Sequence, residues 1–209
     1  MTDTPLTLEI FSDYVCPWCY LGSGRVAKLQ KMFDVRVKFV PFPLHPETPA
    51  EGMTLEQLFG ARGDMDMRRR RNAEMKERMD AEGLPYGDRT HTYNSRLAQE
   101  LAAWADTQPG GEAIHKLLFQ AYFVDNRNIG EINVLLDVVR AAGLDVAEAR
   151  KALEERRFQE QVDADWERAR AYGITGVPTY VAKGYGVVGA QPTEVLEEFL
   201  EKIGAERIA

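Results

Sequence analysis

The chain has 209 residues, of which 44% are hydrophobic and 28% are charged, and its formal net charge is −7. This composition is ordinary for a globular protein, and the negative charge argues against nucleic acid or an anionic membrane surface as a partner. No apolar run in the sequence approaches the roughly 20 residues that cross a bilayer, and the first residues lack the pattern of a signal peptide. We therefore expect a cytoplasmic protein, in a compartment where thiols are mostly reduced.

The first 42 residues predict a strand, a helix and a second strand, at 6–12, 16–32 and 35–42. Both strand segments are rich in β-favouring apolar residues, and the helix carries an apolar stripe interrupted by Gly22 and Gly24. A strand, helix and strand in so short a stretch form a βαβ unit with parallel strands and a right-handed crossover.

From Thr54 to Tyr172 almost every segment has the 3.6-residue apolar period of an amphipathic helix. Thr54 is a candidate helix cap, and Gly83 is a candidate C-terminal glycine. The predicted helices cover 55–59, 64–82, 96–105, 112–124, 132–142, 146–156 and 158–172.

After Gly173 the pattern returns to short strands, at 179–182 and 185–188, joined at Lys183 and Gly184 as an antiparallel hairpin. Thr193 is expected to cap a closing helix. Residues 1–48 plus 173–209 are thus predicted to form one α/β domain, and residues 49–172 an inserted helical domain.

The only two cysteines of the chain, Cys16 and Cys19, lie in the stretch S-D-Y-V-C-P-W-C-Y. Pro17 suits the first turn of a helix that begins after Cys16. The helix dipole and unpaired N–H groups there favour a thiolate on Cys16, and Cys19 lies one turn on, close enough for a disulfide. This arrangement predicts a redox dithiol, in which an exposed Cys16 attacks a disulfide and Cys19 resolves the mixed disulfide. We read Asp13 as a loop residue that caps the same helix.

Two other interpretations of the cysteine pair remain open from the residues alone. The thiols could be buried structural groups that happen to be close. They could also be half of a zinc site, but no histidine stands at a matching spacing, and we predict no metal site. The three histidines are expected to be structural or surface residues: His45, His91 and His115.

Several motifs together resemble the DsbA family, whose members have a thioredoxin fold. They are C-P-W-C-Y after L-E-I-F-S, the helical insertion, and G-V-P-T before the hairpin. Three further motifs are similar to the FrnE-like branch of that family: P-F-P-L-H-P, Y-N-S-R-L-A and V-V-G-A-Q-P. The resemblance implies an α/β thioredoxin fold (βαβ…ββα) with a large all-helical insertion, and it spans essentially the whole chain.

The resemblance also implies a substrate-binding site around the cysteines. The Val177–Pro178 bond is expected to be cis and to face Cys16, so that the Val177 backbone can pair with an extended substrate. Trp18 lies between the cysteines and is expected to be partly exposed beside the substrate. Supporting roles are expected for two neighbours of these residues, Pro17 and Thr179.

Glu9 interrupts the first strand with a carboxylate. The resemblance implies a buried group under the active site that could relay the proton of Cys19. A solvated residue at the edge of the sheet is the equally weighted alternative.

The sequence departs from the DsbA pattern at one important position. Oxidants of this type typically carry C-P-H-C, whereas Trp18 replaces the histidine and cannot donate charge. We therefore expect Cys16 to be less acidic than in those oxidants. Some FrnE-like proteins carry a second cysteine pair, which is absent from this sequence.

The predicted function is a thiol–disulfide oxidoreductase that acts as a reductase or isomerase on disulfides of proteins or small molecules. It needs no cofactor, although glutathione could be its reductant; its oligomeric state is open. One alternative is a glutathione-dependent isomerase or transferase of the kappa or hydroxychromene carboxylate type, in which serine typically replaces the first cysteine. The other alternative is a peptide-binding chaperone that uses the same groove.

Overall fold

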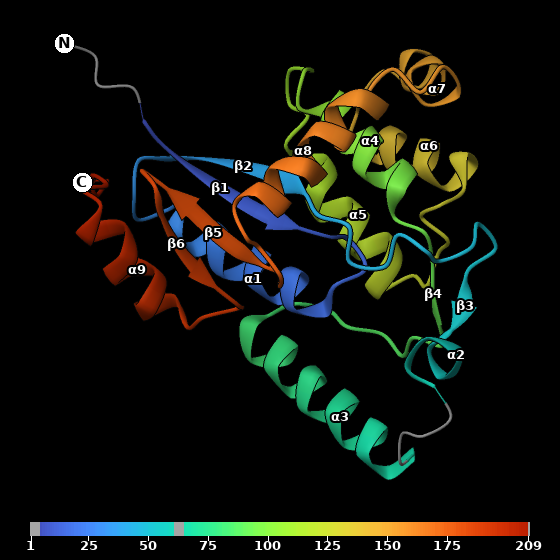
Figure 1. The fold of residues 1–209 in the computed structure, drawn as a ribbon, viewed down its shortest axis with the longest axis horizontal. Helices are drawn as coiled ribbons and strands as arrows, with labels where there is room; N and C mark the ends of the chain where they lie inside the picture. The colour runs from blue at the N-terminus through green and yellow to red at the C-terminus, as the bar shows by residue number, and fades with distance from the viewer. Residues whose placement is uncertain (1–4, 61–64, 209) are drawn as a thin grey trace.

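The computed structural model describes residues 5–60 and 65–208. Its central element is a four-stranded sheet in the order β2-β1-β5-β6 (Figure 1). β1 pairs in parallel with β2 and antiparallel with β5, and β5 and β6 form the predicted antiparallel hairpin. The strands are β1 (Leu6–Ser12), β2 (Val35–Pro41), β5 (Thr179–Ala182) and β6 (Tyr185–Val188).

The two faces of this sheet are covered by different helices. Leu8 and Ile10 of β1 pack in one apolar cluster with α1 (Pro17–Leu29) and α9 (Thr193–Lys202). Phe11 of β1 points the other way and packs with Ala169 of α8 (Gln159–Ala171). Because neighbouring residues of a strand point to opposite faces, this split fixes the direction of every β1 side chain. The chain has the predicted thioredoxin fold with a large helical insertion.

The insertion contains helices at nearly all predicted places: α2 (Leu55–Phe59), α3 (Met65–Glu82), α4 (Arg96–Ala105), α5 (Ala113–Phe123), α6 (Ile132–Ala141) and α7 (Val146–Glu154). Thr54 caps α2 in a capping box, and Gly83 ends α3 with a positive φ of 72°, both as predicted. The predicted start of α3 at Asp64 lies outside the described residues.

Two details of the prediction were wrong. The stretch predicted to be helical also contains a two-stranded sheet, β3 (Met53–Thr54) with β4 (His91–Thr92), too short to show an alternating pattern. Thr193 is the first residue of α9 and follows Pro192 at the cap position, so its side chain does not cap the helix.

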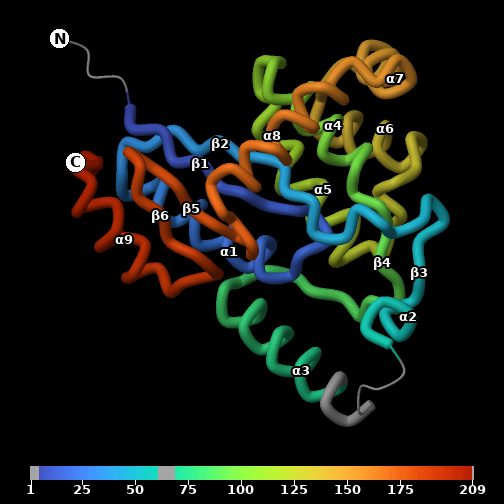
Figure 2. Tube along the Cα trace, viewed as in Figure 1, coloured from blue at the N-terminus to red at the C-terminus, as the bar shows by residue number. Residues whose placement is uncertain are grey.

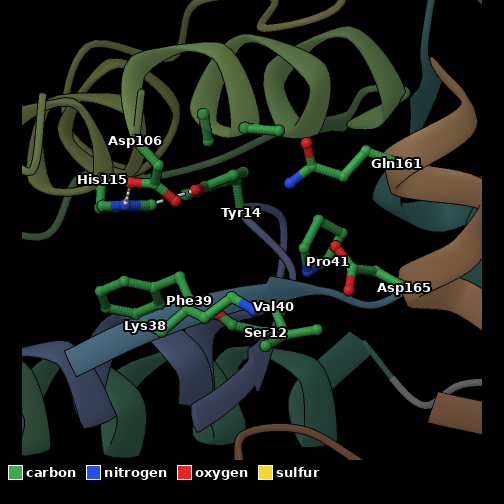
Figure 3. Close-up of a pocket in the computed structure, with 12 residues that line it drawn as sticks. Ser12, Tyr14, Lys38, Phe39, Val40, Pro41, Asp106, His115, Gln161 and Asp165 are labelled. Atoms are coloured by element: carbon green, nitrogen blue, oxygen red, sulfur yellow. Dashed lines mark hydrogen bonds and ion pairs between the residues drawn. The ribbon is translucent and has the colours of Figure 1, made fainter. Parts of the chain in front are cut away.

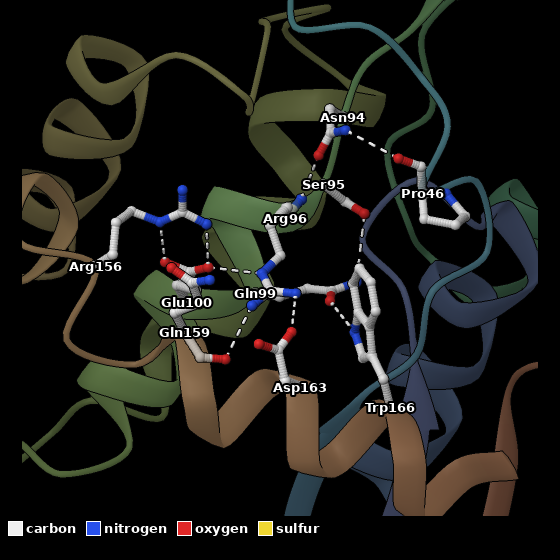
Figure 4. A network of polar contacts seen from close by, with 10 residues as sticks. All are labelled: Pro46, Asn94, Ser95, Arg96, Gln99, Glu100, Arg156, Gln159, Asp163 and Trp166. Carbon is white, nitrogen blue, oxygen red and sulfur yellow. Dashed lines mark hydrogen bonds and ion pairs between the residues drawn. The ribbon is translucent and has the colours of Figure 1, made fainter.

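A network of polar contacts joins the start of α4 to the segment between β2 and β3 and to α8 (Figure 4). Glu100 is buried and receives hydrogen bonds from Arg96 and Arg156, each with a contact of 2.6 Å. Asn94 donates to the carbonyl of Thr48, and Trp166 donates to the Gln99 side chain at 2.8 Å. These contacts explain the Asn and Arg of the Y-N-S-R-L-A motif, because Asn94 holds the start of α4 to the segment after β2 and Arg96 pairs with the buried Glu100.

α3 stands apart from the bundle of the other inserted helices and lies beside α1 (Figure 2). Arg25 of α1 forms an ion pair with Glu82 at the end of α3, at 3.2 Å. Met75 and Met79 of α3 are buried in the same apolar cluster as Cys16 and Cys19. α3 therefore forms part of the surroundings of the cysteine pair.

Candidate active site

The cysteine pair occupies the start of α1, as the sequence predicts. Cys16 is the N-cap residue, with extended backbone angles, and Pro17 takes the first helical position. The Cys16 carbonyl accepts hydrogen bonds from the backbone N–H groups of Cys19 and Tyr20, at 3.1 and 3.2 Å. Both cysteines are free thiols. This cap geometry directs the first N–H groups of the helix toward the Cys16 sulfur.

The pKa values of the two thiols are shifted in opposite directions. A hydrogen bond from the Cys19 thiol lowers the pKa of Cys16 from its usual 9.0, against the effect of burial, and the backbone N–H groups of Cys19 and Trp18 act in the same direction. Burial raises the pKa of Cys19 well above that value, and its hydrogen bond to Cys16 adds to the effect. One thiol is therefore prepared to be a thiolate while its neighbour holds the proton.

The expectation that Cys16 is exposed was wrong. Its residue surface is only 3% exposed, and that of Cys19 only 2%. Trp18, in contrast, is 42% exposed, and the guanidinium carbon of Arg78 in α3 lies 5.7 Å from the centre of its ring. Trp18 is thus an exposed side chain between two buried thiols.

The loop before β5 lies against the Cys16 sulfur. The Val177–Pro178 peptide bond is cis, as expected, and Cys16 Sγ is 3.7 Å from the Val177 carbonyl oxygen. Among the described residues, none accepts a hydrogen bond from the Val177 N–H. The Thr179 hydroxyl donates to the Gly176 carbonyl at 2.7 Å, which closes the loop around Val177. The backbone of Val177 is therefore available beside the thiol.

A hollow of about 780 Å³ lies beside the β5–β6 hairpin, and its lining includes Glu9 but none of Cys16, Trp18, Val177 and Pro178. Residues 173–176 and Thr179 line part of it, together with three large exposed side chains. These are Tyr172, Tyr185 and Val188.

Glu9 does not lie under the active site. Its carboxylate forms ion pairs with Arg168 of α8 at 2.7 Å and with Lys38 at 3.4 Å. It therefore points to the α8 face of the sheet, whereas α1 with Cys19 covers the opposite face. The alternation of β1 side chains gives the reason, because Glu9 shares its face with Phe11 and not with Leu8.

Asp13 does not cap α1, contrary to the expectation. It is buried, and its carboxylate accepts hydrogen bonds from the backbone N–H groups of Val15 and Leu44, at 3.2 and 3.0 Å. Burial raises the pKa of Asp13, and these hydrogen bonds oppose that rise. The residue fixes the loop before Cys16 to the segment that follows β2.

A group of residues that the sequence analysis missed includes Tyr14, in the loop before Cys16, with His115 and Asp106 (Figure 3). The Tyr14 hydroxyl is 2.7 Å from His115 Nδ1, and His115 Nε2 is 2.9 Å from Asp106 Oδ1. His115 is buried, as a structural histidine would be, yet it bridges a residue of the cysteine loop to a surface carboxylate. No local pattern signals this group, because Tyr14 and His115 are 101 positions apart.

Within residues 5–60 and 65–208, no group of three or more His, Cys, Asp or Glu side chains is placed to hold a metal ion. In the same part of the chain, no helix has the length and apolar character to cross a membrane.

Comparisons with known proteins agree with this geometry. Residues 7–201 match the model of the DSBA-like thioredoxin domain. The chain is 30% identical over 192 residues to the uncharacterized protein YwbO of Bacillus subtilis, which covers 91% of this chain and 94% of that protein. A probable DsbA oxidoreductase from Streptomyces coelicolor has a similar structure, with a TM-score of 0.88, 29% identity and coverage of 94% and 89% of the two chains.

More distant structures share the fold. The cytosolic disulfide reductase DsbM from Pseudomonas aeruginosa, also solved with GSH, has a TM-score of 0.68 at 21% identity and covers 94% and 100% of the two chains. A 2-hydroxychromene-2-carboxylate isomerase has a TM-score of 0.75 at 17% identity and covers 95% and 96%. With a family match over nearly its whole length and two thiols at the start of α1, the chain belongs to the DsbA-like thioredoxin-domain family.

Proposed function

We propose that the protein is a thiol–disulfide oxidoreductase in which Cys16 is the nucleophile and Cys19 the resolving thiol. The observation that carries this proposal is the placement of two free thiols at the first turn of α1, with Cys16 Sγ 3.7 Å from the Val177 carbonyl oxygen. The lowered pKa of Cys16 and the raised pKa of Cys19 agree with these roles. A thiolate is the reactive form in disulfide exchange, and a protonated neighbour does not compete with it for the substrate. The family match supports an oxidoreductase of this kind.

The exchange proceeds in two steps. The Cys16 thiolate attacks one sulfur of a substrate disulfide, forms a mixed disulfide and releases the other substrate sulfur as a thiolate. Cys19 then loses its proton and attacks the Cys16 sulfur, so that a Cys16–Cys19 disulfide forms and the second substrate thiolate leaves. The substrate gains two electrons and the protein loses two, with no other redox group involved.

Substrate binding is assigned to the residues around the pair. The unpaired N–H and the carbonyl of Val177 can form backbone hydrogen bonds to an extended segment, as in strand addition. Pro178 holds this loop in place, and Trp18 offers an exposed aromatic surface beside Cys16.

In a reducing cytoplasm, the expected direction is reduction or isomerisation, with glutathione as a candidate electron donor. The neighbour named a cytosolic disulfide reductase, solved with GSH, supports this direction. The FrnE-like branch and the division into 1–48 plus 173–209 and 49–172 remain predictions.

The test is reduction of a protein disulfide, with insulin as substrate and glutathione as donor. Wild type is expected to reduce insulin, and Cys16→Ser to lose this activity completely. Cys19→Ser is expected to accumulate a mixed disulfide with the substrate, visible by mass as one covalent adduct per chain. Ser23→Ala, which alters an α1 hydroxyl that donates only to the Tyr20 carbonyl, serves as the control with full activity.

The same variants separate the alternative functions. A glutathione-dependent isomerase or transferase would retain activity with glutathione in Cys16→Ser. A chaperone would continue to suppress aggregation of a denatured protein when both cysteines are serine. Either result, together with no insulin reduction by wild type, would overturn the proposal.

A further inference from the structure

The resolving step requires a path for the Cys19 proton. Burial holds the proton on this thiol by raising its pKa, and Cys19 is only 2% exposed. Glu9, the carboxylate expected from the sequence to take the proton, faces α8 and is neutralised by Arg168 and Lys38. Some other set of groups must connect Cys19 to solvent.

Ser12 is the first of these groups. Its hydroxyl lies near enough to the Cys19 thiol to lower the pKa of that thiol against the effect of burial. Ser12 is only 6% exposed, and its Oγ makes no hydrogen bond to the thiol or to any other described residue. A buried hydroxyl without a partner costs free energy, which points to a further polar group beside it.

A small cavity beside Ser12 has the properties of a site for one water molecule. Its volume is about 20 Å³, and a cavity needs only about 10–15 Å³ measured in this way to hold a water. Its polar lining residues are Ser12, Tyr14, Lys38, Asp106, His115, Gln161 and Asp165 (Figure 3). A water there lies beside both Ser12 and Tyr14, and a bridging water can join polar groups that do not touch each other.

Tyr14 begins a hydrogen-bonded chain that runs from this cavity to the surface. With the proton of His115 on Nε2, the Tyr14 hydroxyl donates to Nδ1, and Nε2–H donates to Asp106. Tyr14 is 5% exposed and His115 6%, whereas the Asp106 side chain is 38% exposed. Phe39, whose ring centre lies 4.4 Å from that of His115, holds the imidazole in place.

The charges near the hydrogen-bonded series Tyr14, His115 and Asp106 favour movement of a proton toward the surface. Asp106 carries the negative charge at the outer end, and His115 can carry a proton in transit. Lys38 and Asp165 also face the cavity, but each has a partner of opposite sign, Glu9 for Lys38 and Arg168 for Asp165. Asp13 is buried nearby and holds backbone N–H groups.

We propose that Ser12, a water in this cavity, Tyr14, His115 and Asp106 form the proton path that takes the Cys19 proton to solvent during the resolving step. This inference rests on the proposed function. As Cys19 attacks Cys16, its proton passes to the Ser12 oxygen, and the Ser12 hydroxyl proton passes to the water. The water gives a proton to the Tyr14 oxygen, the Tyr14 hydroxyl proton passes to His115 Nδ1, and the proton on Nε2 leaves to solvent through Asp106. The departing substrate thiolate takes a proton from solvent, so charge is balanced.

A reaction with an aromatic disulfide separates the two steps. With 5,5′-dithiobis(2-nitrobenzoate), attack by Cys16 releases one coloured thiolate, and attack by Cys19 on the mixed disulfide releases the second. Stopped-flow absorbance at 412 nm therefore records two phases. The first phase tests the proposed function, and only the second phase tests the proton path.

Tyr14→Phe and Asp106→Asn are the test variants. Tyr14→Phe removes the hydroxyl but keeps the ring that packs on Phe119, and Asp106→Asn keeps an acceptor for His115 but removes the charge. Each is expected to slow the second phase about 10-fold to 100-fold near neutral pH, since a positioned acid or base contributes ~10²-fold or more. The first phase should stay within about twofold of wild type.

The pH profile provides a readout that a structural role would not alter. At high pH, hydroxide can remove the Cys19 proton directly, so the deficit of both variants should shrink. Tyr20→Phe is the matched control, because its buried hydroxyl donates to the Pro85 carbonyl and lies outside the path; both of its phases should match wild type.

The proposal is overturned if the second phase of Asp106→Asn, a variant at a surface position, matches wild type across the pH range. It is also overturned if Tyr20→Phe slows that phase as much as Tyr14→Phe. If the first phase is absent in wild type, the proposed function itself fails.

Discussion

The carboxylate of Asp13 accepts a hydrogen bond from the backbone N–H of Leu44, with 3.0 Å between Oδ2 and the nitrogen. This contact ties the loop before Cys16 to the P-F-P-L-H-P segment after β2, and it explains why a charged residue is buried three positions before the nucleophile. The same negative charge raises the pKa of Cys16. Asp13 thus stabilises the loop while opposing the thiolate.

Asp13→Asn should therefore lower the pKa of Cys16 further. The amide keeps one oxygen for a backbone N–H but loses the charge, so the thiolate is favoured while the fold is destabilised by roughly 1–3 kcal/mol. The absorbance at 240 nm, recorded as a function of pH, measures the fraction of Cys16 that is present as thiolate. Asp34→Asn, at an exposed position after α1, is the control, and equal titration curves for the two variants would contradict the prediction.

Cys19 controls the acidity of Cys16 through its thiol proton. Cys19→Ala removes the hydrogen bond that is the main cause of the lowered pKa of Cys16, so burial dominates and the pKa should rise. Cys19→Ser keeps a donor at the same place and should give an intermediate pKa. The rate of Cys16 alkylation by iodoacetamide against pH measures both variants. If alanine and serine give the same Cys16 pKa, the hydrogen bond is not the cause.

The parts of the molecule that follow from local patterns could be predicted from the sequence. The strands at 6–12, 179–182 and 185–188 and the helix start after Cys16 depend on short-range periodicity, on proline and on glycine. The direction of Glu9 could not be predicted, because it depends on which helix covers each face of the sheet. The partnership of Tyr14 with His115 depends on how the insertion folds back, and no spacing in the sequence records it.

The reduced protein should be most stable near the usual pKa of a thiol. The pKa of Cys16 is lowered in the folded state, so between that value and 9.0 unfolding takes up a proton and the free energy of unfolding rises with pH. The pKa of Cys19 is raised in the folded state, so above 9.0 unfolding releases a proton and stability falls. Urea unfolding from pH 6 to 10 should show this maximum in the reduced wild type and not in a variant with both cysteines replaced by serine. A constant difference between the two proteins would refute it.

Trp18→His should make the Cys16–Cys19 disulfide more oxidising. A protonated imidazole at this half-exposed position favours the Cys16 thiolate and so stabilises the reduced form. The pKa of Cys16 should fall, and equilibrium with glutathione should shift toward the reduced dithiol. Trp18→Phe keeps an uncharged ring and should leave both quantities near those of wild type. If histidine and phenylalanine behave alike, charge at this position does not set the redox equilibrium.

Gly22 sets the distance between α1 and the strand that follows Pro178. A Cβ at Gly22 would lie 2.5 Å from the Tyr180 hydroxyl oxygen and 3.3 Å from Pro178 Cγ, and Tyr180 is fully buried. Gly22→Ala should therefore push α1 away from β5, destabilise the protein by roughly 1–3 kcal/mol, and slow the attack of Cys16 on a disulfide. Urea unfolding and the first phase of the reaction with the aromatic disulfide measure the two effects.

A second substitution tests whether this close approach is the cause. The Tyr180 hydroxyl has no hydrogen-bond partner among the described residues, so Tyr180→Phe removes the clashing atom at little cost. Gly22→Ala combined with Tyr180→Phe should regain most of the lost stability and rate. Gly24→Ala is the control within α1, because its Cβ would meet the side chains of Leu84 and Glu82, at 2.9 and 3.1 Å, so Tyr180→Phe should not rescue it. If Tyr180→Phe restores nothing to Gly22→Ala, or rescues Gly24→Ala equally, contact with Tyr180 does not determine how α1 and its cysteines are placed.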